Sequence, residues 1–183
     1  ELMDLVERMQ SAFTTIAKSK VPTIALAHGF CIGGATSLVS ACDIRLATKD
    51  AKFSIGETKL GLVADVGVIQ RMPKIVSSGD MNELALTGRV FDGEHAERIR
   101  FVSKVYENSD ELFEAGEKLA NEISSNSKRI VQATKQALEK SSNLTVDQGL
   151  EYAKLWSTSF LVSEDLREGV MAFLEKRDPK FNE

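Results

Sequence analysis

Cysteine is scarce in this sequence. Cys31 and Cys42 are the only two, and they do not form a CxxC pair. A disulfide framework needs more cysteines than this, and a structural zinc site usually needs cysteines or histidines in closely spaced pairs. The sequence therefore indicates neither kind of site, and we predict no bound metal. A reducing compartment fits this cysteine usage best.

Long apolar runs and basic clusters are also missing. No run approaches the roughly 18 apolar residues that a membrane-spanning helix requires. The net charge is −4 and lysine and arginine do not cluster, which argues against a nucleic-acid partner. No signal or transit peptide is recognisable, but the sequence opens directly on a helical pattern, as though upstream residues were absent, so targeting stays undecided.

The two common glycine motifs for phosphate binding, GxGxxG and GxxxxGK[ST], are absent as well. What the sequence does contain is the composition of an ordinary globular protein, with 43% apolar and 27% charged residues. Its 183 residues suffice for a proper core. Strands with crossovers come first and helices alone follow, which predicts an α/β core over 1–108 and a helical region over 109–183.

Apolar periodicity predicts the individual elements. Residues 2–18 repeat apolar positions at helical spacing and should form a helix with one buried face. The short run 23–27 lies between breakers and is typical of a buried strand in a parallel sheet. We expect further strands at 43–47, 52–55 and 101–105, and helices at 34–41, 68–72, 80–86, 93–98, 109–124, 127–141, 146–160 and from Ser163. A capping box, Thr145-x-x-Gln148, introduces the helix at 146–160.

A glycine-rich turn follows the first strand and contains Gly29, Gly33 and Gly34. A turn between a strand and a helix leaves main-chain N–H groups without partners, and glycine lets a ligand approach them closely. The Gly34 N–H is therefore a candidate donor to an oxyanion. The plainer alternative is a tight turn that only feeds a helix.

Two isolated acids, Glu57 and Asp65, lie downstream of this turn. Glu57 follows a strand at the point where α/β sheets hold their ligands, and Asp65 interrupts the apolar segment 60–69. Two carboxyl groups in one dry pocket can accept and donate protons on opposite sides of a substrate. The alternatives are that Glu57 is a solvated loop acid and that Asp65 caps the next helix.

Two histidines and one serine are weaker candidates. His28, beside the apolar strand, favours a structural role in a hydrogen bond, and His95, in a polar helix, is expected on the surface. Ser37 has neither a GxSxG setting nor a clear His and Asp partner, so it is a poor candidate for a nucleophile.

Taken together, four segments resemble the enoyl-CoA hydratase/isomerase (crotonase) superfamily, and most of all its Δ3,5-Δ2,4-dienoyl-CoA isomerase branch. They are HGFCIGGATSLVSACDIR at 28–45, AKFSIGETKLGLVADVGVIQRMPK at 51–74, LTGRVFDGEHAERIRFVSKV at 86–105 and EGVMAFLEKRDPKF at 168–181. The resemblance implies an α/β fold with a crotonase-like (ClpP/crotonase) spiral core and a C-terminal helical oligomerisation region. It also leads us to expect that the N-terminal part of that fold is missing from this chain.

The resemblance implies a role for each matched residue. Gly34 corresponds to the residue whose N–H forms half of the hole for the thioester oxygen. Glu57 and Asp65 correspond to the two acids that move protons between the ends of a conjugated diene. The implied reaction converts a 3,5-dienoyl-CoA into the 2,4-dienoyl-CoA in fatty-acid β-oxidation.

The resemblance also implies partners and surroundings. The predicted substrate-binding residues are Gly33, Ser37, Phe173 and Lys176, of which the last two match positions that reach the CoA of an adjacent subunit. A homotrimer, or a hexamer built as a dimer of trimers, is implied. No separate cofactor is expected, because CoA is part of the substrate. The implied location is the mitochondrion or peroxisome in a eukaryote, or the cytoplasm in a bacterium.

One departure from the family pattern keeps rival functions open. Hydratases of this superfamily carry a second acid at the position of Ser37, and dienoyl isomerases usually have an aspartate there. Hydration, which needs two carboxylates to hold and split a water, is thereby disfavoured. The rivals are a Δ3-Δ2-enoyl-CoA isomerase that uses Glu57 alone, a weak enoyl-CoA hydratase, and a non-catalytic acyl-CoA-binding protein.

Overall fold

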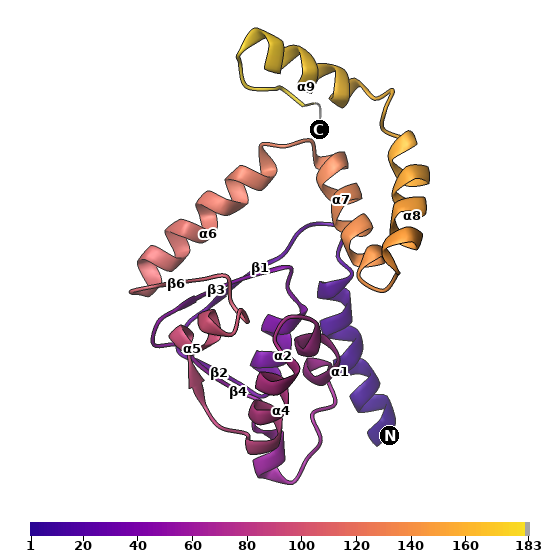
Figure 1. Cartoon of the computed structure of the whole chain (residues 1–183). Coiled ribbons are helices and arrows are strands. Elements are labelled where there is room, and N and C mark those ends of the chain that lie inside the picture. Colours follow the sequence, from indigo (N-terminus) through magenta and orange to yellow (C-terminus); the bar gives the residue numbers. More distant parts are fainter. Residues whose placement is uncertain (182–183) are drawn as a thin grey trace. The chain divides into compact units, whose positions relative to one another are not determined.

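The structure is a computed structural model that describes residues 1–181 (Figure 1). The chain forms two compact units, which we describe separately. The first consists of Glu1–Ser19 and Thr23–Lys118, and the second of Lys20–Pro22 and the segment from Leu119 onward. The boundary predicted between residues 108 and 109 stays a prediction. No helix within residues 1–181 is both long and apolar enough to cross a bilayer.

The first unit alternates short strands and helices, as the sequence predicts. Its strands are β1 (Ile24–Ala27), β2 (Phe30–Ile32), β3 (Ile44–Thr48), β4 (Lys52–Ser54), β5 (Phe91–Asp92) and β6 (Lys104–Tyr106). Its helices are α1 (Leu2–Ala17), α2 (Gly34–Ala41), α3 (Val68–Arg71), α4 (Ser78–Thr87) and α5 (Gly93–Arg98), with the 3₁₀ turns η1 (Gly56–Leu60) and η2 (Met72–Lys74). The strand expected at 101–105 begins only at Lys104, whereas β2 lies inside the segment interpreted as a glycine-rich turn.

The strands form two small sheets. β1, β3 and β6 make a parallel sheet in the order β1-β3-β6, and β2, β4 and β5 make the second sheet, in which β4 and β5 are antiparallel. Gly29, with φ of +62°, lies between β1 and β2 and lets the chain pass from one sheet to the other. In the second sheet Ile32 lies opposite Ser54, which brings the end of β2 to the end of β4.

Three phenylalanines form the centre of the core in the first unit. The rings of Phe53 and Phe91 stack with centroids 5.5 Å apart, and Phe101 meets Phe53 edge-on at 5.5 Å. Phe53 and Phe101 are fully buried and Phe91 nearly so. Because burying an aromatic side chain stabilises a fold by about 1.5–3 kcal/mol, this cluster holds β4, β5 and the segment before β6 together.

The helices of the second unit are α7 (Lys128–Ser141), α8 (Val146–Thr158) and α9 (Glu164–Glu175), and α6 (Ser109–Ser124) leads into it. The predicted capping box of Thr145 and Gln148 is confirmed. Trp156 of α8 donates a hydrogen bond from Nε1 to the Ala133 carbonyl of α7 at 3.1 Å. Tyr152 stacks on Trp156, and Trp156 meets Phe160 edge-on just after the end of α8.

The buried face expected for the first helix is absent from the part of the chain described here. α1 forms as predicted, but none of its residues is buried, and Leu2, Leu5 and Met9 are 80%, 55% and 43% exposed. Leu38 of α2 is also 38% exposed. Hydrophobic periodicity reports which face of a helix is apolar, whereas burial depends on a partner surface, which these side chains lack within residues 1–181.

Two helical glycines should respond to alanine in opposite ways. A Cβ at Gly93 would lie 2.0 Å from the Thr48 carbonyl oxygen, whereas a Cβ at Gly149 would make only ordinary contacts of 3.7 Å or more. We expect Gly93→Ala to lower the free energy of unfolding by about 1–3 kcal/mol through overpacking. Gly149→Ala should raise it by up to about 1 kcal/mol through helix propensity. Thermal unfolding of both variants tests this, and a Gly93→Ala variant as stable as the parent would contradict the packing.

The ion pair between Arg177 and Glu168, which holds the chain after α9 against that helix, should make the stability of the protein depend on pH. Arg177 donates to both carboxylate oxygens of Glu168, at 2.6 and 3.0 Å, and the Lys180 N–H donates to Glu168 at 2.7 Å. These bonds lower the pKa of Glu168 from an ordinary 4.5 to about 2. A lowered pKa in the folded state stabilises above the unfolded pKa, and this stabilisation disappears as pH falls from about 4.5 toward about 2.

The difference in melting temperature between the parent and Glu168→Gln should therefore be largest above pH 4.5 and shrink below it. Glu114→Gln is the matched control, because Glu114 is an exposed acid of α6 that makes no ion pair within residues 1–181. A difference that stays constant across this pH range would show that the Glu168 carboxylate does not contribute.

Candidate active site

The turn between β2 and α2 is held by hydrogen bonds to its main chain. Gly33 adopts φ of +58° and ψ of −116°, a conformation that favours glycine. Its N–H donates to the Ser54 carbonyl at 2.9 Å, and its carbonyl accepts from the Ser37 N–H at 3.0 Å. The turn is therefore fastened to the end of β4 on one side and to the first turn of α2 on the other.

The buried side chain of Thr36 also holds α2 in place. Its side chain is fully buried, and its hydroxyl lies within hydrogen-bonding distance of the carbonyl oxygens of Cys31 and, at 3.0 Å, Ser54. The first belongs to β2 and the second to β4, so one hydroxyl ties α2 to both strands. Sequence reasoning missed this positioning residue. The available signal was a threonine in the first turn of a helix, where side-chain bonds to nearby backbone are common.

Space remains open beside Gly34, the first residue of α2. A Cβ added to Gly34 would meet no atom within 4 Å. Within the described residues its N–H makes no hydrogen bond outside the helix, as is usual for the first position of a helix. The Gly34 N–H is thus a free main-chain donor next to unfilled space, which an oxyanion hole requires.

The carboxyl group of Glu57 lies against this turn. A Cβ at Gly33 would be 3.4 Å from Glu57 Oε1. The Oε2 atom of Glu57 is buried and has no hydrogen-bond partner within residues 1–181. A buried carboxylate oxygen without a partner is unfavourable for the fold, and such exceptions gather at functional sites. The alternative that Glu57 is a solvated loop acid is therefore wrong.

The 3₁₀ turn that carries Glu57 is itself held in place. Thr58, the next residue, donates from its hydroxyl to the Ala85 carbonyl of α4 at 2.7 Å. Ser54, at the end of β4, donates from its hydroxyl to the Gly88 carbonyl at 3.0 Å. The Glu57 carbonyl accepts from the Leu62 N–H at 3.0 Å. The backbone beneath the acid is thus bonded to α4 and to the loop that follows it.

Ser37 lies one helical turn after Gly33 and is fully buried. Its main-chain N–H bonds back to Gly33, but its hydroxyl oxygen has no hydrogen-bond partner among the described residues. Two buried polar groups of the predicted site, the Ser37 hydroxyl and the Glu57 carboxyl, therefore each have one unpartnered oxygen. Gly33, Gly34 and Ser37 lie at the turn and the start of α2, and Glu57 lies against Gly33. That these residues bind and convert a substrate stays a prediction.

Asp65 is placed differently from the other candidates. It lies in the loop between η1 and α3 and is exposed, although its neighbours Ala64 and Val66 are buried. Its carbonyl accepts from Gln10 Nε2 at 2.7 Å, and its carboxylate makes no hydrogen bond or ion pair within residues 1–181. The N-cap of α3 is Gly67, without a side-chain cap. The alternative role of Asp65 as a helix cap is therefore wrong.

An arginine stabilises the loop that carries Asp65. Arg71 of α3 donates to the Val66 carbonyl at 3.2 Å and to the Thr14 hydroxyl of α1 at 3.1 Å. Its guanidinium lies against Gly67, where a Cβ would come within 1.9 Å of Nη1 and where φ is +114°. Only glycine fits this position. Arg71 and Gly67 therefore hold the loop in place beside α1.

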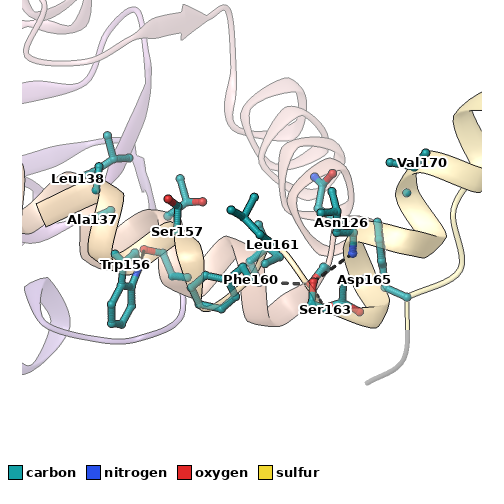
Figure 2. Close-up of a pocket in the computed structure, with 18 of the residues that line it drawn as sticks. Asn126, Ala137, Leu138, Trp156, Ser157, Phe160, Leu161, Ser163, Asp165 and Val170 are labelled. Atoms are coloured by element: carbon teal, nitrogen blue, oxygen red, sulfur yellow. Dashed lines mark hydrogen bonds between the residues drawn. The ribbon is translucent and has the colours of Figure 1, made fainter. Parts of the chain in front are cut away.

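The remaining predicted site residues, Phe173 and Lys176, belong to the second unit. Phe173 is 82% exposed near the end of α9, and Lys176 caps that helix with φ of +54°. Phe173 also lines an apolar pocket of about 760 Å³ formed by α7, α8 and α9. Figure 2 shows Trp156, Phe160 and Leu161 among the side chains that line it.

The His28 ring is exposed and meets the Phe113 ring edge-on at 5.8 Å, and its carbonyl accepts a long contact from Cys31 Sγ. Among the residues that the structure describes, no group of three or more His, Cys, Asp or Glu side chains could hold a metal ion.

Comparison with known proteins gives one family. A family model described as enoyl-CoA hydratase/isomerase matches residues 3–183. A mitochondrial Delta(3,5)-Delta(2,4)-dienoyl-CoA isomerase from Dictyostelium discoideum is 48% identical, with 99% of this chain and 62% of that protein covered. A peroxisomal protein of the same name from Arabidopsis thaliana is 42% identical, with 99% and 65% covered. The chain thus spans less than two thirds of the length of these relatives.

Solved structures confirm the predicted fold. An enoyl-CoA hydratase from Bacillus anthracis superposes with a TM-score of 0.92 at 28% identity, covering 98% of this chain and 69% of that one. A putative enoyl-CoA hydratase/isomerase family protein from Hyphomonas neptunium gives 0.89 at 34% identity, with 96% and 66% covered. The crotonase-like fold implied by the sequence is therefore present.

Replacing Thr36 tests how the turn is held. Thr36→Val keeps the side-chain shape but leaves two buried carbonyl oxygens without this hydroxyl. We expect the free energy of unfolding to fall by about 1–3 kcal/mol and the melting temperature to fall with it. Thr15→Val is the matched control, because Thr15 is an exposed helical threonine bonded to the Ser11 carbonyl. Equal melting temperatures for the two variants would contradict the positioning role of Thr36.

Proposed function

The chain belongs to the enoyl-CoA hydratase/isomerase family, and from this premise we propose that it is an isomerase that converts a 3,5-dienoyl-CoA into the 2,4-dienoyl-CoA. The observation that carries the proposal is the Glu57 carboxyl, which has a buried, unpartnered oxygen and lies against the turn that presents the free Gly34 N–H. The names of relatives 48% and 42% identical to this chain support the choice of reaction.

The Gly34 N–H donates a hydrogen bond to the thioester carbonyl oxygen of the substrate. When a proton leaves the acyl chain, negative charge spreads through the conjugated system onto that oxygen. A preorganised main-chain donor stabilises this charge more strongly in the transition state than in the substrate, by roughly 3 kcal/mol for one donor. The same interaction makes the α and vinylogous protons of the acyl group acidic.

Glu57 and Asp65 transfer the protons. One carboxylate removes a proton from one end of the conjugated segment, and the other carboxylic acid returns a proton to the other end. The electron pair left by the first step moves through the double bonds, so the diene shifts along the chain without net gain or loss of atoms. In this proposal the two acids act at different carbons, one as the general base and the other as the general acid.

A second candidate function is favoured by the position of Asp65. Asp65 is exposed, and of the two acids only Glu57 has its carboxyl group placed against the glycine turn by a described distance. A Δ3-Δ2-enoyl-CoA isomerase needs only one carboxyl that removes and returns the same proton. Hydration is disfavoured, because Ser37 stands where hydratases of the family carry their second acid. Binding of acyl-CoA without catalysis is the remaining alternative.

Phe173 and Lys176 extend the proposal to CoA binding in an oligomer. Phe173 is 82% exposed at the end of α9, where its ring is available to contact CoA, and Lys176 supplies positive charge for phosphate groups. In this proposal both residues serve the site of an adjacent subunit in a homotrimer or in a dimer of trimers. The exposed apolar side chains of α9, Leu166, Val170 and Leu174, are consistent with an interface.

The proposed setting is fatty-acid β-oxidation. Relatives of the same name are described as mitochondrial in Dictyostelium discoideum and Mus musculus and as peroxisomal in Arabidopsis thaliana. We therefore place the protein in one of these two organelles if its host is a eukaryote, and in the cytoplasm if the host is a bacterium. The substrate is an acyl-CoA thioester, with no separate cofactor.

Conservative replacement of the two acids tests the mechanism. Asp65→Asn in the protein at its native length should lower 3,5-dienoyl-CoA turnover at least about a hundredfold, because one general acid or base typically contributes a rate factor of about this size. Glu57→Gln should abolish turnover of both dienes and monoenes, since it serves both candidate reactions. Ultraviolet absorbance follows diene migration, and calorimetry follows acyl-CoA binding. Asp50→Asn, in the exposed turn before β4, is the matched control.

The outcomes separate the candidates. Unchanged diene turnover after Asp65→Asn would remove Asp65 from the mechanism. Turnover of a 3-enoyl-CoA, but of no diene, by the parent protein would favour the Δ3-Δ2 isomerase. Binding of acyl-CoA without any turnover would favour the non-catalytic alternative.

A further inference from the structure

A second recess, of about 350 Å³, lies at the opposite end of β4 from the glycine turn. Its polar lining consists of Lys52, Arg89, Asp92, Glu94, His95 and Arg98. Lys52 is the first residue of β4 and lies opposite Asp92 of β5, after which α5 begins. Ser54, the last residue of β4, is the one that holds Gly33. The recess and the candidate active site therefore share a strand but no residue.

Positive charge predominates among the groups of this recess that are free to bind a ligand. The half-buried Lys52 makes no ion pair within the described residues, and Arg98 bonds to a histidine ring and not to a carboxylate. Of the two acids, Asp92 is already used, because its carboxylate caps α5 by accepting from the His95 N–H at 2.9 Å. Glu94 is exposed at the start of α5. The third cation of the recess, Arg89, is already paired with Glu83 at 3.0 Å.

His95 is the only histidine in this recess, and one of its ring nitrogens has no partner. Arg98 Nη2 lies 2.6 Å from His95 Nδ1. A guanidinium can only donate, so Nδ1 accepts and the proton of the neutral ring is on Nε2. Nε2 is buried and has no hydrogen-bond partner within residues 1–181. Burial, with the nearby Arg98 and Arg89, lowers the pKa of His95. The prediction that His95 is an ordinary surface residue is therefore wrong.

We propose that this recess binds a phosphate group, held by Lys52 and Arg98 beside the His95 ring. A phosphate dianion has oxygens that accept from several donors at once, and bonds between charged groups are the strong ones. Arginine matches its geometry with a fork of donors, and lysine adds a point charge. The volume exceeds that of a bare phosphate, and Val90 and Phe91 provide an apolar side. Inorganic phosphate and a phosphate monoester share this chemistry.

Nuclear magnetic resonance of the histidine rings tests the proposal directly, because the chain contains only two histidines. Inorganic phosphate is titrated into the protein while potassium chloride keeps the ionic strength constant. We expect saturable shifts of the His95 ring nitrogens and no comparable shifts of His28. Lys52→Gln, which leaves the Arg98 to His95 bond in place, should weaken phosphate binding at least about tenfold. Arg98→Gln provides a second, independent variant.

Lys118→Gln and Arg8→Gln are matched controls, because both residues are exposed on helices outside the recess. They remove the same charges and should change phosphate affinity by less than about twofold. Titration with adenosine 3′-phosphate distinguishes the sources. Tighter binding than inorganic phosphate identifies a phosphate carried on a larger molecule, and equal binding identifies free phosphate; both support the site.

Two results would overturn the proposal. One is a His95 ring that shows no saturable response to either probe. The other is an affinity that Lys52→Gln and Arg98→Gln leave as unchanged as the control variants do. Neither result depends on isomerase turnover, so this proposal and the proposed function can fail separately.

Discussion

The carbonyl oxygen of Ser54 is the acceptor on which the candidate site depends. It receives the Gly33 N–H at 2.9 Å and lies 3.0 Å from the Thr36 hydroxyl. The chain then continues from Ser54 through Gly56 to Glu57. Ser54, at the end of β4, therefore holds the glycine turn through its carbonyl and lies just before the 3₁₀ turn that carries Glu57. This explains why a main-chain donor and a carboxyl 23 positions apart, at residues 34 and 57, meet at one place.

The polar groups at this site make fewer hydrogen bonds than the polar side chains that hold the site's backbone in place. Thr36, Thr58 and Ser54 make side-chain hydrogen bonds to main-chain carbonyls, whereas the Ser37 hydroxyl and Glu57 Oε2 are buried and have no hydrogen-bond partner in the described part of the chain. A fold tolerates such groups only where the surrounding structure holds them, and they gather where a ligand can complete their bonding. The same contrast marks His95, whose Nδ1 is bonded while Nε2 is not.

Local signals predicted most of the elements. The capping box of Thr145 and Gln148, the helix α2 and the helix α6 were all found from residue type and spacing. β2 was missed, because Phe30–Ile32 is short, lies between glycines and is a strand only through its pairing with β4. For the candidate site, Glu57 and Gly34 were proposed from residue type and spacing, whereas Thr36 was missed, because its partners are 5 and 18 residues away.

The sequence by itself determined the chemistry that this chain can offer: a glycine turn, two acids downstream of it, and amphipathic helices after them. Residue type and periodicity are local properties, so they can be read without a fold. Only the tertiary structure decided which groups meet. It placed Glu57 against Gly33, left Asp65 exposed and the apolar face of α1 at most half-buried, and placed Lys52 and Arg98 around one recess. These arrangements depend on strand register and on packing between distant segments, which no local pattern contains.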